Sequence, residues 1–165
     1  MRWYLSHRAD ARAAQIADRH YNRQKIGSPQ FVPPGRCLVL LTERADALWV
    51  TSWPYPQFVK HAWAGAFMCS CFRNESTYLA SELIIEAVAA TRWYYGNPPP
   101  LGFITFVDTG KIKSINPGYC YKKAGWVHVG HTQGGLVALQ LKPQDMPPAE
   151  MPNGAQLALD WEMTG

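Results

Sequence analysis

The sequence predicts a single α/β (α+β) domain, in which helices flank a central mixed, mostly antiparallel sheet. The chain has 165 residues, 47% hydrophobic and 17% charged, so it is long enough and apolar enough to bury one core. Short apolar runs between glycines and prolines have the length of strands, and two longer segments have helical spacing. We expect residues 1–145 to form the domain and residues 146–165 to form a tail that packs on it or is loosely attached.

The N-terminal part is expected to contain a short strand over Arg2–Leu5 and then a helix over His7–Gln24. Ser6 is the candidate N-cap of this helix, and the apolar stripe of the helix carries His20 inward near its end. Residues 26–35 hold three prolines and form a loop, which is either a cover over a substrate or a plain connector. Two strands should follow, separated by a turn: Cys37–Thr42 and Ala47–Trp53.

The central part is expected to be a buried strand, Trp63–Phe72, followed by a helix over Ser81–Tyr95. Strand alternation places the thiols of Cys69 and Cys71 on the same side, where we expect them to be buried and reduced. The remaining elements should be a strand, a short helix that stops at a glycine, and a hairpin. They occupy Phe103–Val107, the turn before Gly125, and the pair Trp126–Gly130 and Leu136–Leu141.

Charge and cysteine content narrow the classes of protein. The net charge of +4 permits a polyanionic partner without requiring one. No apolar run reaches the roughly 18 residues of a membrane helix, and the N-terminus does not read as a signal peptide. The four cysteines have neither a disulfide framework nor zinc-site spacing, so we expect no metal site and a cytoplasmic location.

One stretch carries a family resemblance. Tyr121–Trp126 reads YKKAGW and resembles the "YEKLGF" helix end of the GNAT acyltransferase fold. The wider window Gly102–Thr132, GFITFVDTGKIKSINPGYCYKKAGWVHVGHT, is similar to Mom-type phage DNA-modification proteins, a divergent GNAT-like branch. The block His20–Arg23, HYNR, resembles their "HYSR". The resemblance implies a GNAT-like domain whose middle strands splay apart to admit an acyl donor.

The resemblance also implies catalytic roles. Tyr121 takes the position of a tyrosine that protonates the departing thiolate of coenzyme A. Asp108, at the end of a strand, and His20 are the candidates for accepting the proton of the attacking nitrogen, with Tyr21 beside His20. Two plain interpretations stay open: Asp108 caps the following loop, and His20 is a hydrogen-bonded interior histidine. Metal ligation by His20 is a further alternative.

For the acyl donor, expected to be acetyl-coenzyme A or a related acyl-CoA, the resemblance points to the central strand and the helix after it. A backbone N–H near Met68 and Ser70 is the candidate oxyanion donor. The candidate phosphate partners are Arg73, Ala80 and Ser81, although Arg73 is equally an exposed charge and Ser81 a helix cap. The loop itself departs from the family pattern, because Glu75 and Tyr78 stand where a Gln or Arg and a glycine are usual.

The leading functional prediction is a phage-type DNA-modifying enzyme that adds a small acyl or acyl-derived group to a nucleobase nitrogen. Its expected partners are DNA and an acyl-CoA, with no membrane, in the cytoplasm of a bacterial host. The candidate DNA contacts, which also read as solvated charges, are Arg23, Lys111, Lys113 and Lys122. Two alternatives stay open: an acetyl-CoA-dependent N-acetyltransferase of a small-molecule or protein amine, and a non-catalytic nucleic-acid-binding module.

Overall fold

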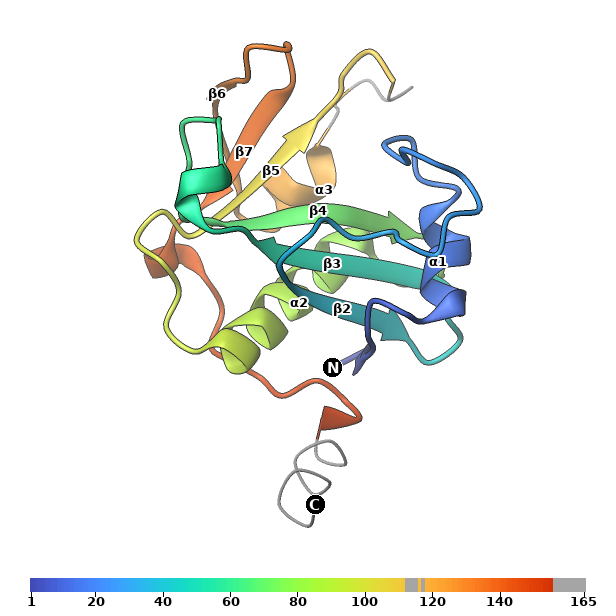
Figure 1. Cartoon of the computed structure of the whole chain (residues 1–165). Helices are drawn as coiled ribbons and strands as arrows, with labels where there is room; N and C mark the ends of the chain where they lie inside the picture. Colours follow the sequence, from blue (N-terminus) through green and yellow to red (C-terminus); the bar gives the residue numbers. More distant parts are fainter. Residues whose placement is uncertain (112–115, 117, 156–165) are drawn as a thin grey trace.

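The computed structural model describes residues 1–111, 116 and 118–155, and these form a mixed α+β fold (Figure 1). A seven-stranded, mostly antiparallel sheet has the order β1-β2-β3-β4-β5-β7-β6. Its strands are β1 (Trp3–Leu5), β2 (Arg36–Thr42), β3 (Ala47–Trp53), β4 (Phe67–Asn74), β5 (Phe103–Val107), β6 (Val127–His131) and β7 (Val137–Leu141). The α-helices of the described part are α1 (Ala11–Ala17), α2 (Ala80–Tyr95) and α3 (Tyr119–Lys123), and the short 3-10 helices are η1 (Pro56–Phe58) and η2 (Pro143–Asp145). The predicted fold class is confirmed at this level.

Strands β4 and β5 are parallel, and they pair only where they begin. The ladder joins Phe67 to Phe103 and Met68 to Ile104 and then stops. Beyond that point the Thr105 hydroxyl donates to the Cys69 carbonyl oxygen at 3.1 Å, so a side chain replaces the ladder. Figure 1 shows the two strands diverging from this common start toward their carboxyl ends. The sheet is therefore open at its middle, as expected.

A β-bulge in β4 corrects one prediction. Cys69 pairs with Thr51 and Cys71 with Val50, so Ser70 is an extra residue in the ladder with β3. The bulge breaks the alternation of side chains, and Cys69 packs in the core under α2 while Cys71 packs in the core under α1. Both thiols are buried and free, as predicted, but they lie on opposite faces of the sheet, not on the same one.

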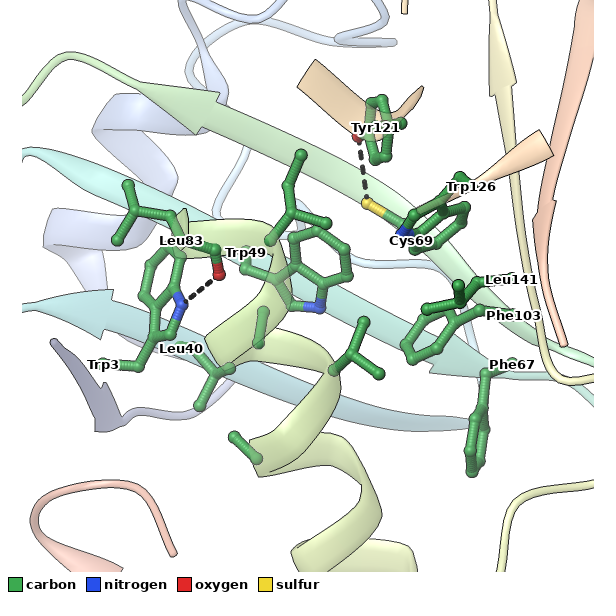
Figure 2. Packing of buried hydrophobic residues seen from close by; sticks show 14 of the residues in the cluster. Trp3, Leu40, Trp49, Phe67, Cys69, Leu83, Phe103, Tyr121, Trp126 and Leu141 are labelled. Atoms are coloured by element: carbon green, nitrogen blue, oxygen red, sulfur yellow. Dashed lines mark hydrogen bonds between the residues drawn. The ribbon is translucent and has the colours of Figure 1, made fainter. Parts of the chain in front are cut away.

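The larger core lies between the sheet and α2 (Figure 2). Leu83, Ile84, Ala87 and Val88 of α2 are completely buried against the aromatic residues of the strands. The indole N–H of Trp3 donates to the Leu83 carbonyl oxygen at 2.8 Å, which ties β1 to the first turns of α2. Burial of this helix face and of these aromatic rings stabilises the sheet that contains the diverging strands β4 and β5.

The opposite face is covered by α1 and by the segment around Phe31 and Val32. Helix α1 is much shorter than the predicted His7–Gln24. Asp10, not Ser6, caps its start by accepting from the Arg12 backbone N–H at 2.9 Å. The helix ends at Ala17, because the next carboxylate, Asp18, accepts from the Arg23 side chain and holds the chain in a turn.

Two further boundaries differ from the prediction. The buried strand begins at Phe67, because Trp63 to Ala66 form a turn in which the Ala66 N–H donates to the Trp63 carbonyl oxygen. Helix α2 begins at Ala80 with Leu79 in the N-cap position and without a side-chain cap, so Ser81 lies in the first turn and is not the cap.

Residues 146–155 of the predicted tail pack on the domain. Asn153 exchanges backbone hydrogen bonds with Trp3 and Leu5, and Ala155 is buried. Residues 156–165 of the predicted tail lie outside the described residues. Among the residues that the structure describes, no helix is long and apolar enough to span a membrane.

Candidate functional site

Two cavities adjoin the opening between β4 and β5. The smaller, about 410 Å³, lies on the side of α3 and is lined by Thr105, Tyr119 and Tyr121, among others. The larger, about 840 Å³, lies under residues 21–34 and is lined by Phe31, Asp108 and others. The two share a set of residues from β4, β5 and the segment after α1: Tyr21, Asn22, Cys69, Ser70, Cys71 and Phe106. The two cavities therefore adjoin each other along these residues.

Tyr121 is part of the lining of the smaller cavity and belongs to the short helix α3. The helix is framed by two glycines with positive φ, Gly118 (79°) and Gly125 (96°), and the second re-enters the sheet as predicted. The phenol oxygen lies 3.4 Å from the Cys69 sulfur (Figure 2). Burial raises the pKa of Tyr121 well above its ordinary value of 10, so the group stays a neutral phenol and holds its proton more tightly than an exposed tyrosine does.

His20 and Tyr21 lie together at the opening, with their rings stacked at a centroid distance of 4.5 Å. The Asn22 backbone N–H donates to His20 Nδ1 at 3.2 Å, and burial lowers the pKa of the imidazole. His20 is therefore a neutral ring whose accepting nitrogen is already occupied. The ring is hydrogen-bonded, as in the plain interpretation, but His20 is only half-buried and follows α1, which ends at Ala17, so a helix does not carry it inward as predicted. Its role as a base stays a prediction.

Asn22 is a site residue that the sequence analysis missed. Its side-chain amide donates to the Ser70 carbonyl oxygen at 3.0 Å, so the segment after α1 is fastened to the bulged residue of β4. Its place inside the block His20–Arg23 was the only signal in the sequence, because the partner is 48 residues away.

Asp108 follows β5 directly and lines the larger cavity. Its Oδ1 accepts from the Gly110 backbone N–H at 3.0 Å, so it does cap the turn, which was the alternative interpretation. It also lies beside the Tyr21 hydroxyl. Burial raises the pKa of Tyr21, and a hydrogen bond with the Asp108 backbone opposes that shift. The structure thus brings together Asp108 and Tyr21 from opposite ends of the chain.

Side chains of the loop between β4 and α2 form hydrogen bonds with the backbone of the same loop. Asn74 Oδ1 accepts from the Ser76 N–H at 2.9 Å, and Ser76 Oγ accepts from the Tyr78 N–H at 3.1 Å. The Glu75 carboxylate is held by Arg19 and by Arg73, each at 2.7 Å, and these bonds lower its pKa to about 2. The amides of Ser76 and Tyr78 and the guanidinium of Arg73, three groups of this loop that could contact a pyrophosphate, are therefore bonded within the chain.

The other predicted donor-side residues are spread along β4 and α2. Met68 lines the larger cavity, Ser70 lines both cavities, and Ala80 lines the smaller one. Ser81, in the first turn of α2, lines neither of the two. Among the described residues, the lining of the smaller cavity contains no Lys or Arg, and this part of the lining suits an uncharged group better than a phosphate.

The residues predicted to contact DNA differ in their burial and in their hydrogen-bond partners. Arg23 has a side chain only 7% exposed, and its guanidinium binds Asp18 and the carbonyl oxygens of Ser28 and Gln30. It therefore organises the loop over the larger cavity, and its contact with DNA stays a prediction. Lys111 lines that cavity, and Lys122 donates to Asn116 at 3.2 Å. Lys113 lies outside the described residues.

No cluster of histidines, cysteines and carboxylates able to hold a metal occurs among the residues that the structure describes. In comparisons with known proteins, no family model, no curated protein and no solved structure matches this chain. The site is therefore interpreted from its own geometry.

Proposed function

We propose that the protein is a GNAT-like enzyme that transfers a small acyl or acyl-derived group from a thioester to a nucleobase nitrogen in DNA. The observation that carries the proposal is the divergence of β4 and β5 after two paired residues, with a cavity on each side of the opening. Two substrates can approach a shared centre from opposite sides in this arrangement. Holding both in place is a large part of the catalysis of a group transfer.

The smaller cavity supports the role of donor site. Its walls are mostly apolar or weakly polar, and they include Tyr121, whose phenol oxygen lies against the Cys69 sulfur. The proposal concerns the acyl thioester end of the donor, because Arg73 and the Ser76 and Tyr78 amides of the loop before α2 are already bonded within the chain. The extra residue of β4, Ser70, lies at the junction of the two cavities, where a backbone N–H would stabilise the oxyanion of the tetrahedral intermediate.

The larger cavity supports the role of acceptor site. Its lining combines aromatic rings, Tyr21, Phe31 and Phe106, with the amide side chains of Asn22 and Gln30. Aromatic faces stack on an unpaired base, and amides recognise its hydrogen-bonding edge. A volume of about 840 Å³ leaves room for a base together with its sugar.

The proposed acyl transfer forms one covalent bond, breaks another and moves two protons. The acceptor nitrogen forms a bond to the acyl carbon, and the carbon–sulfur bond of the thioester breaks. The proton of the nitrogen passes to Asp108, because the accepting nitrogen of His20 is already bonded to Asn22. The departing thiolate takes the phenol proton of Tyr121, which is then replaced from solvent.

The test is the nucleoside composition of plasmid DNA from bacteria that express the chain, measured by mass spectrometry. The expected result is a new nucleoside with the wild-type chain and none with the Asp108→Asn variant. Purified protein with plasmid DNA and acetyl-coenzyme A provides the same comparison outside the cell. Unchanged nucleosides in both settings contradict the proposal. Acetylation of a small amine with unchanged DNA would instead support the acetyltransferase alternative.

A further inference from the structure

At the start of β2, the guanidinium group of Arg36 lies between two aromatic rings. Its Cζ is 4.0 Å from the ring centroid of Trp53 and 4.4 Å from that of Tyr55. Its Nε donates to the Trp53 carbonyl oxygen at 3.0 Å, and Arg36 pairs with Trp53 in the β2–β3 ladder. The backbone and the two rings thus hold the guanidinium in one orientation, with its outer N–H groups turned away from this bond.

A second guanidinium group lies close by. Arg8 donates to the Gly35 carbonyl oxygen and to the Cys37 sulfur, which anchors it across the start of β2. A cavity of about 370 Å³ opens beside both arginines, and its lining, as far as the described residues form it, also contains His7 but no Asp or Glu. Within the described part of the chain, neither Arg8 nor Arg36 forms an ion pair with a carboxylate. The described lining of this cavity therefore carries positive charge without a paired carboxylate.

The end of α2 supplies a rigid aromatic wall to this cavity. The Tyr95 ring packs against Trp53 at 5.1 Å and against Phe67 at 5.7 Å. Burial raises the pKa of Tyr95 to about 12, and the charges of Arg36 and Arg8 oppose the shift, so both guanidinium groups lie near this hydroxyl. Tyr94, 47% exposed, also lines the cavity and presents an aromatic face.

A fixed, planar guanidinium recognises a phosphate through two parallel hydrogen bonds, and an adjacent aromatic face suits a base. We propose that this cavity is a separate binding site for the phosphate group of a nucleotide. It shares no lining residue with either cavity at the β4–β5 opening, so its occupation does not depend on the acyl-transfer proposal. The phosphate belongs either to a free mononucleotide or to the backbone of a nucleic acid.

Isothermal titration distinguishes a free mononucleotide from a nucleic-acid backbone as the ligand. Four probes are used: inorganic phosphate, adenosine, AMP and a single-stranded thymidine octanucleotide. Each probe is titrated into the wild type and into the Arg36→Gln variant. The matched control is Arg44→Gln, which removes the same charge from the β2–β3 turn. Loss of a bidentate phosphate contact should weaken binding by about tenfold or more, whereas the control should stay within about twofold.

Binding of AMP but not of adenosine, lost selectively in Arg36→Gln, supports the site with a free nucleotide as its ligand. A selective loss seen only with the octanucleotide supports it with a nucleic-acid backbone as its ligand. Equal effects of the two variants, equal affinity for adenosine and AMP, or no binding of any probe overturns the proposal.

If the Arg36→Gln variant does not fold, the Arg36→Lys variant tests the same site. Lysine retains the charge but loses the planar fork and the stacking between two rings. The affinity for the phosphate-bearing probe should fall in this variant as well. A folded Arg36→Lys protein with wild-type affinity overturns the proposal.

Discussion

Replacing Tyr121 by phenylalanine removes one oxygen atom from the centre of the proposed site. That oxygen is buried, and its hydrogen bond to the Cys69 sulfur is 3.4 Å long. A neutral hydrogen bond contributes about 0.5–1.5 kcal/mol to stability, and a thiol is a weak partner. The free energy of unfolding should therefore change by no more than about 1 kcal/mol.

The expected effect on turnover is much larger. General acid catalysis contributes about 10²- to 10⁴-fold to a rate. At about 1.36 kcal/mol for each factor of ten, this corresponds to roughly 2.7–5.4 kcal/mol of transition-state stabilisation. The loss of turnover should therefore exceed anything that the small change in stability explains.

The assay follows the modified nucleoside in plasmid DNA over time with purified protein, and urea unfolding of each variant is measured in parallel. Tyr4→Phe on β1 is the control, because its ring is partly exposed and far from both cavities in the sheet order. A folded Tyr121→Phe protein with turnover within about twofold of the wild type refutes the role of this phenol as the acid.

The remaining predictions concern the base, the loop before α2 and one tight glycine. Asp108→Asn should abolish modification while keeping the turn, because an amide oxygen still accepts a hydrogen bond, and full activity rejects the assignment. The pKa of Glu75 is lowered from 4.5 to about 2 by two guanidinium groups, so its contribution to stability is present above pH 4.5 and is lost as the pH falls toward 2. The difference in unfolding free energy between wild type and Glu75→Gln, measured by urea unfolding, should shrink over that pH range. Glu43→Gln is the control, because Glu43 has no ion pair in the described chain, and it should not show this pattern. A constant difference for Glu75→Gln contradicts the pairing. Gly102→Ala, at a position with positive φ, places a Cβ 2.2 Å from a β7 carbonyl oxygen and should lower the free energy of unfolding by about 2–5 kcal/mol. Gly27→Ala, also at positive φ but with no atom within reach of its Cβ, should lower it by about 1–2 kcal/mol. Equal losses of stability in thermal unfolding contradict the packing at Gly102.

The strands were predictable because their signals are local. Apolar runs between turn residues gave Ala47–Trp53 and Phe103–Val107 correctly, and the glycine before Trp126 marked the end of α3. The opening between β4 and β5 was expected only from the family resemblance, since no local pattern says where a parallel pair stops.

The errors arose where a side-chain contact or an extra strand residue overrides the local sequence pattern. Helix α1 stops early because Asp18 binds Arg23 and the Gly27 N–H, although the sequence around it is compatible with a helix. The bulge at Ser70 separates Cys69 from Cys71, and strand alternation alone does not show an extra residue.

The most direct test of the central claim is where a short thioester binds. S-acetylpantetheine, which lacks the pyrophosphate, is titrated into ¹⁵N-labelled protein, and the amide shifts are followed by NMR. The geometry predicts changes concentrated at Ser70, Thr105 and Gly118, around the smaller cavity. Saturable binding with those changes supports a donor slot between β4 and β5, whereas unchanged amides there, or changes confined to another face of the sheet, contradict it.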